Sequence, residues 1–171
     1  MVWKPGLIGN NCDLLGISVA AQRICNLQRV VYETEVMAVL AQSDSLASAQ
    51  SIDLADLAAK PLVMLDTAPS SDYTQLLFSQ RELTPIFGAI VPQIDLVRAL
   101  VGRGLSYSLL MSRPNHTPVS SEGLGLVTRH LNPRSGVTSV VAVWPTGFTP
   151  SARAPTVIDY AIEALEVSEP S

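Results

Sequence analysis

Two patterns of apolar and polar positions alternate along the chain, and together they predict an α/β fold. Continuous apolar runs at 36–41 and 62–65 are typical of short buried strands, and 86–91 predicts a further strand. Apolar residues at helical spacing, opposed by polar ones, predict helices over 72–81 and 96–101. Strands that alternate with helices in this way favour a mostly parallel sheet.

The segment 96–110 carries the strongest of these signals, a helix that leads directly into a strand. Its apolar stripe consists of Leu96, Val97, Leu100 and Val101. Gly102 and Gly104 then supply the positive φ with which helices often end, and the apolar run 105–110 predicts a buried strand. Such a helix–strand step is half of a βαβ unit. Ligands of open α/β sheets bind at the carboxyl ends of the strands, so a binding site is expected at that edge.

The other segments are less regular. Residues 43–51 are small and polar. A single helical turn is predicted at 52–57. Strands are expected at 124–129 and 137–143, and Ser151 is expected to cap a last helix. The first 28 residues match no pattern and stay unassigned.

Composition and charge exclude several classes of protein. The chain has 171 residues, of which 47% are apolar and only 15% charged, so it can bury a sizeable core and is too apolar for disorder. Its net charge is −4 and its basic residues do not cluster, so direct contact with DNA is not expected. The apolar stretch 14–21 is shorter than the roughly 20 residues that a membrane span requires.

Candidate chemistry is sparse. Cys12 and Cys25 have no histidine at metal-binding spacing, so we expect reduced thiols in a cytoplasmic protein, and no metal site. No glycine-rich phosphate loop is present in the sequence, so no cofactor is expected. Residues 104–108 nearly spell the Gly-x-Ser-x-Gly elbow of hydrolases, but Ser108 replaces the last glycine and the elbow would lead into a strand. We therefore expect no enzymatic activity and no catalytic residues.

Four segments, taken in order, carry a further signal. They are 33–47, with Val-Leu-Ala-Gln-Ser-Asp-Ser-Leu at its end; 52–66, with Leu-Ala-Asp-Leu before Pro-Leu; 69–73, which reads Pro-Ser-Ser-Asp-Tyr; and 96–110. In this order and spacing they resemble the effector-binding domain of LysR-type transcriptional regulators. Ser71 stands where one branch of that family has arginine, and Ser106 where the family usually has glycine.

The resemblance implies two Rossmann-like lobes of the periplasmic-binding-protein type, with a small-molecule effector bound in the cleft between them. It assigns 46–136 to the second lobe, and 29–45 with 137–168 to a first lobe that is incomplete. It also implies a homodimer formed through the first lobe. The family's helix-turn-helix has no counterpart in these residues, and residues 1–28 do not match the family. Either the chain is a fragment or its start belongs to a different reading of the gene, and we expect the second.

The first predicted ligand-binding segment comprises Ser70, Ser71, Asp72 and Tyr73. It opens a predicted helix that follows a strand, where free amides and the helix dipole favour an anion. The alternative is a plain helix cap by Ser70 or Ser71, with Asp72 complementing the dipole. Because Asp72 would repel an anion, a hydroxyl or amine on the ligand suits this position better.

The second predicted segment comprises Pro92, Gln93 and Ile94, which open the next helix at the same sheet edge. In the resembled family the matching segment lines the cleft, and the Gln93 side chain can both donate and accept hydrogen bonds. The alternative is a solvent-exposed glutamine in an ordinary loop. Tyr107 and Ser108, on a central strand, are expected to be core residues.

Three classes of function follow. The resemblance favours a regulatory domain that senses a small metabolite. A solute-binding module of the periplasmic type is the second, although no signal peptide is evident. The third is a truncated, non-functional remnant, in which the strand at 36–41 would be left as an exposed edge.

Overall fold

Strand β1 (Leu27–Ala41) belongs to both of the compact units into which the chain divides. The computed structural model describes residues 27–68, 70–112, 118–144, 151 and 153–166. Among these residues, unit 1 holds those before Glu35 and after Gly136, and unit 2 holds those from Glu35 to Gly136. Residues 1–26, and with them nearly all of the unassigned start, lie outside the described part.

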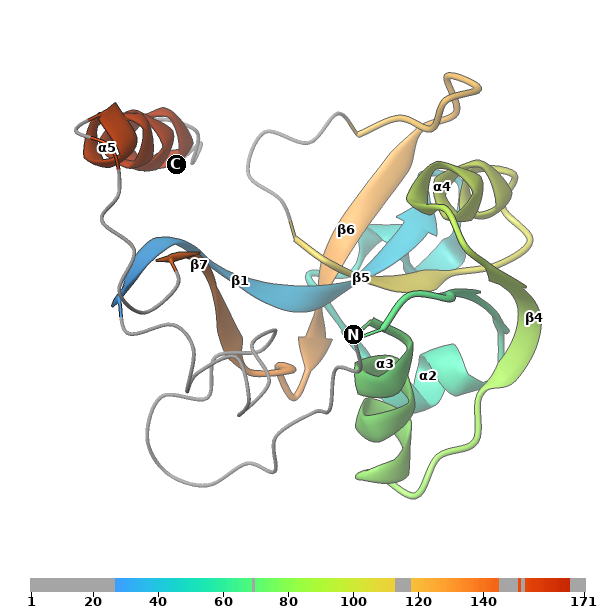
Figure 1. The fold of residues 1–171 in the computed structure, drawn as a ribbon. Helices are drawn as coiled ribbons and strands as arrows, with labels where there is room; N and C mark the ends of the chain where they lie inside the picture. Colours follow the sequence, from blue (N-terminus) through green and yellow to red (C-terminus); the bar gives the residue numbers. More distant parts are fainter. Residues whose placement is uncertain (1–26, 69, 113–117, 145–150, 152, 167–171) are drawn as a thin grey trace. The chain divides into compact units, whose positions relative to one another are not determined.

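The larger sheet is built on β1. Its second half pairs antiparallel with β5 (Ser108–Met111) on one side and with β6 (Leu126–Asn132) on the other. β2 (Ser51–Asp53) lies parallel to β6, and β7 (Val137–Trp144) also pairs with β1 (Figure 1). Because the segment 36–41 has neighbours on both sides, the exposed edge expected for a remnant is not found there.

A second, two-stranded sheet consists of β3 (Pro61–Leu65) and β4 (Ile86–Val91), which run parallel as predicted. It meets the larger sheet where Leu62 bridges Tyr107, and the Val63 amide donates to the Tyr107 carbonyl at 2.8 Å. The prediction of a mostly parallel sheet is wrong, because β1 runs antiparallel to both β5 and β6. β1 enters from unit 1 rather than through a helical crossover, and parallel pairing arises from such crossovers.

The described helices follow the strands in the expected order. α3 (Ser70–Ser79) follows β3 and α4 (Ile94–Gly102) follows β4, close to the predicted 72–81 and 96–101. η1 (Ser45–Ser48) and α2 (Leu54–Ala58) lie between β1 and β3, and α5 (Arg153–Glu166) belongs to unit 1. Among the described residues, no helix is long and apolar enough to span a membrane.

Side-chain caps set the start of the two short helices before β3. The Asp53 carboxylate accepts from the Ala55 amide at 2.8 Å, so α2 begins at Leu54 and residues 51–53 stay extended in β2. The Asp44 carboxylate accepts from the Leu46 amide at 2.9 Å and starts η1 in the same way. The helical turn predicted at 52–57 therefore begins two residues later than expected.

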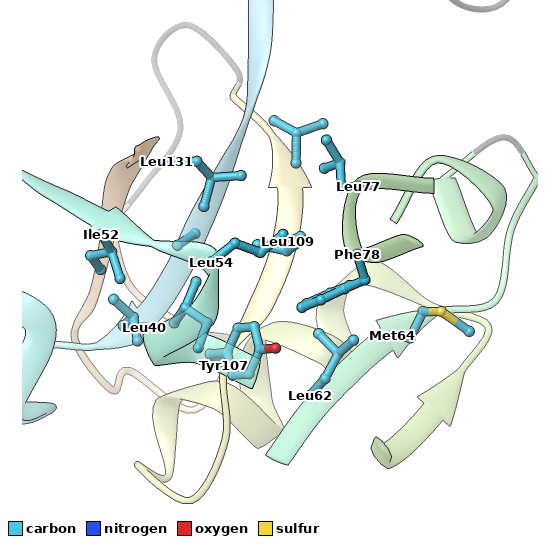
Figure 2. Packing of buried hydrophobic residues seen from close by; sticks show 13 residues of the cluster. Leu40, Ile52, Leu54, Leu62, Met64, Leu77, Phe78, Tyr107, Leu109 and Leu131 are labelled. Carbon is cyan, nitrogen blue, oxygen red and sulfur yellow. The ribbon is translucent and has the colours of Figure 1, made fainter. Parts of the chain in front are cut away.

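The core of unit 2 consists of two clusters. Successive residues of a strand point to opposite faces of the sheet, and each cluster lies on one face. The first contains Tyr107 together with Leu57 of α2 and Phe78 of α3. Figure 2 shows the Tyr107, Phe78 and Leu62 side chains gathered in this cluster. The second contains Val97 and Val101 of α4, which are fully buried. Helices thus cover both faces of β3, as the predicted burial of 62–65 requires, whereas β4 is mostly exposed, with Ile86, Phe87 and Ile90 on the surface.

Tertiary packing modifies the apolar stripe predicted at 96–110. Leu96 was expected inside, yet it is 43% exposed, while Val97 and Val101 carry the contact with the sheet. Leu105 is 80% exposed, so the strand that was predicted from 105 begins only at Ser108. Tyr107 and Ser108 are completely buried, which confirms them as core residues.

The two glycines of that segment serve different purposes. Gly104 has the predicted positive φ, at 79°. Gly102 does not; it is the last residue of α4, and a Cβ built there would lie 3.1 Å from the Cβ of Leu124. Gly104 therefore adopts a backbone conformation that other residues avoid, whereas Gly102 leaves room for Ser120 and Leu124 in the loop before β6.

Candidate functional site

The two predicted ligand-binding segments lie at the same end of the β3–β4 sheet. The strands end together, because Leu65 pairs with Val91 and the Asp66 amide donates to the Val91 carbonyl at 2.8 Å. α3 begins shortly after Asp66 and α4 shortly after Val91. We call this region the carboxyl edge; it comprises Asp66, residues 70–73 and residues 92–95. Ligands of open α/β folds bind at such an edge.

Ser70 and Ser71 lie in the first turn of α3, so the prediction that either of them caps the helix from outside is wrong. The Thr67 carbonyl accepts from the Ser70 amide at 2.7 Å and from the Ser71 amide at 3.2 Å. A backbone turn thus satisfies two amides that the sequence suggested were open to a ligand. Ser71 is buried, whereas the Asp72 carboxylate is exposed at the helix start and complements its dipole.

Tyr73 anchors α3 to the loop that connects β6 with β7. Its hydroxyl donates to the Ser135 carbonyl at 2.6 Å, and the ring packs half-buried against the first core cluster. Burial raises the pKa of the Tyr73 phenol, and the charge of Arg81 and the bond to Ser135 offset this only in part. The hydroxyl is therefore neutral at physiological pH and is engaged with the protein.

Gln93 is the most accessible polar side chain of the second predicted segment. It precedes α4 with extended backbone angles (φ −127°, ψ 132°), and its side chain makes no capping bond. Its carbonyl accepts from the Val97 amide at 3.1 Å. Pro92 is exposed as well, while Ile94 is half-buried and packs against the second core cluster. In this segment Gln93 is the residue that can present both a donor and an acceptor to a ligand.

The carboxyl edge is acidic. Asp66, Asp72 and Asp95 are exposed there. The basic side chains described in unit 2 are engaged elsewhere: Lys60 with Asp44, Arg81 with the Pro133 carbonyl, Arg98 with the Val119 carbonyl, Arg103 with Glu122, Arg129 with the Ala47 carbonyl, and Arg134 with Glu35. Within unit 2 the edge is therefore suited to a hydroxyl or ammonium group rather than to an uncompensated anion.

A polar cluster on β1, on β6 and in the loop after β6 was not predicted from the sequence. The His130 Nδ1 lies 2.8 Å from Glu35 Oε1, and the Arg134 guanidinium donates to the same oxygen at 3.3 Å. The Ser135 hydroxyl accepts from the Val36 amide and donates to the Val36 carbonyl, both at 3.0 Å. We call these four side chains, Glu35, His130, Arg134 and Ser135, the Glu35 cluster. Glu35 lies almost a hundred residues from the other three members, and only the β1–β6 register could have revealed the cluster.

The described residues contain no group of three or more histidine, cysteine, aspartate or glutamate side chains that could hold a metal ion. Cys12 and Cys25 lie outside the described residues, so the expectation of reduced thiols stays a prediction.

The order of elements, with helices following parallel strands and a long strand shared by two units, defines a lobe of the periplasmic-binding-protein type. The family model of the LysR substrate binding domain matches residues 21–166. The chain belongs to this family of effector-binding domains.

Solved structures agree with this assignment. The chain is 30% identical to HinK, a LysR family transcriptional regulator from Pseudomonas aeruginosa, with a TM-score of 0.72 over 81% of this chain and 47% of HinK. It is 31% identical to the C-terminal domain of a LysR family regulator from Rhodococcus sp. RHA1, with a TM-score of 0.69 over 79% of this chain and 66% of that domain. The CcmR regulatory domain from Synechocystis PCC6803 shares the fold at 13% identity, with a TM-score of 0.67 over 85% of this chain and 69% of that domain.

The chain spans about half the length of the Pseudomonas aeruginosa regulators that it matches. Among proteins with curated descriptions, none matches the chain significantly.

Proposed function

We propose that the chain is the effector-sensing part of a LysR-type transcriptional regulator and binds a small metabolite at the carboxyl edge. The main support is that the two predicted segments follow strands that end side by side, at Leu65 and Val91. The chain also belongs to the LysR substrate-binding family. Ser70, Ser71, Asp72 and Tyr73 form one part of the proposed site, and Pro92, Gln93 and Ile94 the other.

Complexes of proteins with the same fold support the proposal that the ligand is a small organic molecule. The CcmR regulatory domain was solved in complex with 2-PG, and the effector-binding domain of QuiR in complex with shikimate. In the present chain the acidic side chains of the carboxyl edge favour a ligand that places a hydroxyl or ammonium group beside Asp72. Gln93 is proposed to fix the ligand's orientation, and Tyr73 to act as a positioning residue through Ser135.

The remaining properties of the regulator are part of the same proposal. The domain binds its effector without catalysing a reaction, acts in the cytoplasm as a homodimer, and leaves DNA contact to another part of the regulator. An effector of this kind shifts the balance between two conformations only by the difference in its affinity for them. The assignment of 46–136 to the second lobe, and of 29–45 with 137–168 to the first, stays a prediction.

Thermal unfolding in the presence of a defined panel tests the proposal. The panel contains 2-PG, shikimate, the corresponding amides, and small amino alcohols. A ligand present at a hundred times its Kd stabilises the folded state by about 2.7 kcal/mol, which unfolding experiments resolve easily.

Two exposed glutamines of unit 2 provide a matched pair of variants. Gln93→Ala is expected to weaken the response to the active ligand, whereas Gln80→Ala, just after the end of α3, is expected to leave it unchanged. A panel without any stabilising compound, or equal responses of the two variants, would contradict a site at the carboxyl edge.

A further inference from the structure

Strand β1 enters unit 2 at Glu35, but it pairs with β6 only from Ala38 onward. Residues 38–41 of β1 pair with residues 126–129 of β6. Residues 130–132 of β6 pair with β2 instead. The Val36 backbone, immediately after the passage from unit 1 into unit 2, therefore lies outside the ladder that β1 forms with β6.

The hydrogen-bonding groups of the Val36 backbone face the side of β1 on which β6 lies. In an antiparallel ladder, successive residues direct their backbone groups to opposite sides of the strand. The Glu35 carbonyl accepts from the Ser112 amide at 2.9 Å, next to β5, so the amide and carbonyl of Val36 face away from β5. Val36 is buried, and its two backbone groups need a partner on that side.

The Ser135 hydroxyl takes the place of a neighbouring strand at Val36. It accepts from the Val36 amide and donates to the Val36 carbonyl, both at 3.0 Å. Ser135 lies in the loop between β6 and β7, almost a hundred residues away along the chain. One half-buried side chain thus satisfies both backbone groups of Val36.

Tyr73 holds the backbone of Ser135 from α3. Its hydroxyl donates to the Ser135 carbonyl at 2.6 Å. Tyr73 lies in the first turn of α3 and belongs to the carboxyl edge, where the ligand is proposed to bind. A continuous series of hydrogen bonds therefore leads from this edge, through Ser135, to the start of unit 2. All of these groups belong to unit 2.

Two other side chains bind the same loop, but at its surface. Arg81 donates to the Pro133 carbonyl at 2.9 Å, and Arg134 donates to Glu35 Oε1 at 3.3 Å. Both interactions are exposed, whereas the bond from Tyr73 is partly buried and reaches Ser135 itself. Because exposed charged groups keep their access to water, we expect Tyr73 to determine the position of Ser135.

We propose that Ser135 is a positioning residue that couples the carboxyl edge to β1 where this strand enters unit 2. Tyr73 fixes the Ser135 carbonyl, and the Ser135 hydroxyl fixes Val36. The role of this coupling rests on the proposed function: a ligand that shifts the first turn of α3 acts on β1 through these two bonds. The coupling itself requires no ligand.

Amide hydrogen exchange of the full chain without ligand tests the coupling. Tyr73→Phe removes the hydroxyl and keeps the ring that packs against the core. We expect the protection of the Val36 amide to fall about fivefold and that of the Ser112 amide about twofold, because Ser135 loses one hydrogen bond. Amides in the centre of β3 are expected to keep their protection. Tyr160→Phe, an exposed change on α5, serves as the control and should leave Val36 unchanged.

A double-mutant cycle shows whether the effect of Tyr73 passes through Ser135. Ser135→Ala removes both bonds to Val36 but keeps the carbonyl that accepts from Tyr73. In this background Tyr73→Phe is expected to have no further effect on the Ser112 amide. Ser135→Thr, which keeps a hydroxyl, is expected to exchange at Val36 as the wild type does.

Three results would overturn the proposal. They are an unchanged Val36 amide in Tyr73→Phe, equal losses of protection at Val36 and in β3, and an equal effect of Tyr73→Phe with and without the Ser135 hydroxyl. The first two need only Tyr73→Phe and decide the case in which Ser135→Ala does not fold. None of the three bears on the ligand panel, so failure of the coupling and failure of the proposed function are distinguishable.

Discussion

Replacement of Asp44 by asparagine is expected to lower the unfolding free energy of unit 2 by about 2 kcal/mol. The Asp44 side chain is 3% exposed and accepts from the Lys60 ammonium as well as from the Leu46 amide. Asparagine keeps an oxygen for Leu46 but loses the charge that pairs with Lys60. A hydrogen bond between charged groups contributes about 1.5–3 kcal/mol. The lower half of this range applies because Lys60 is 29% exposed and retains access to water.

The loss should depend on pH, with a defined sign. Burial alone would raise the pKa of Asp44, but the hydrogen bonds from Lys60 and Leu46 and the charge of Lys60 outweigh it and hold that pKa below its ordinary value. The ionised carboxylate therefore stabilises the fold fully above the unfolded-state pKa of about 3.9, and this stabilisation is lost as the pH falls through the folded-state pKa. The asparagine variant is expected to approach the wild type in acid.

Urea unfolding followed by far-UV circular dichroism measures both effects. A double-mutant cycle with Lys60→Met isolates the pair, and we expect a coupling energy of about 1.5 kcal/mol. Asp56→Asn, an exposed change on α2, serves as the control and should stay within about 0.5 kcal/mol of the wild type. A coupling energy below about 0.5 kcal/mol, or a deficit that does not vary with pH, would refute the reasoning.

Two further predictions concern the core and one turn. The Tyr107 hydroxyl is buried without a hydrogen-bond partner among the described residues, and burial raises its pKa, so Tyr107→Phe should leave the unfolding free energy unchanged or increase it by up to about 1 kcal/mol. Chemical denaturation at neutral pH checks this, and a loss above about 1 kcal/mol would show that the hydroxyl has a partner. Gly104→Ala should cost about 1 kcal/mol because of its φ of 79°, and Gly104→Asn should cost less, since asparagine tolerates that conformation; equal Tm values for the two variants would contradict a conformational cause.

The core elements of unit 2 could be predicted because their signals are local. The apolar runs at 62–65 and 86–91 became β3 and β4, and the stripe around Val97 and Val101 became the buried face of α4. The predictions were wrong where contact with another segment decides whether a residue is buried or how a helix begins. Leu105 belongs to an apolar run yet lies exposed, because the sheet contacts begin only at Tyr107. The Thr67 carbonyl, rather than a serine side chain, accepts the hydrogen bonds of the first two amides of α3.

The candidate site was predictable in position but not in detail. A strand followed by a helix implies a carboxyl edge, and two such steps in succession imply that 70–73 and 92–94 lie at one edge if their strands are parallel neighbours. The pairing of Leu65 with Val91 bears this out. The charge of that edge, in contrast, depends on where distant basic side chains are engaged, which the order of residues along the chain does not reveal.

The sequence by itself determined where most of the strands and helices of unit 2 lie and which helices follow which strands, because hydrophobic periodicity acts within a few residues of each position. Only the tertiary structure decided the antiparallel course of β1, the engagement of Asp44 with Lys60, and the meeting of Glu35 with His130. These features join residues from 16 to nearly a hundred positions apart. A hydrogen bond or ion pair forms between groups that packing brings within about 3 Å. Neither apolar runs nor helical spacing of apolar residues indicates which distant groups will be brought together.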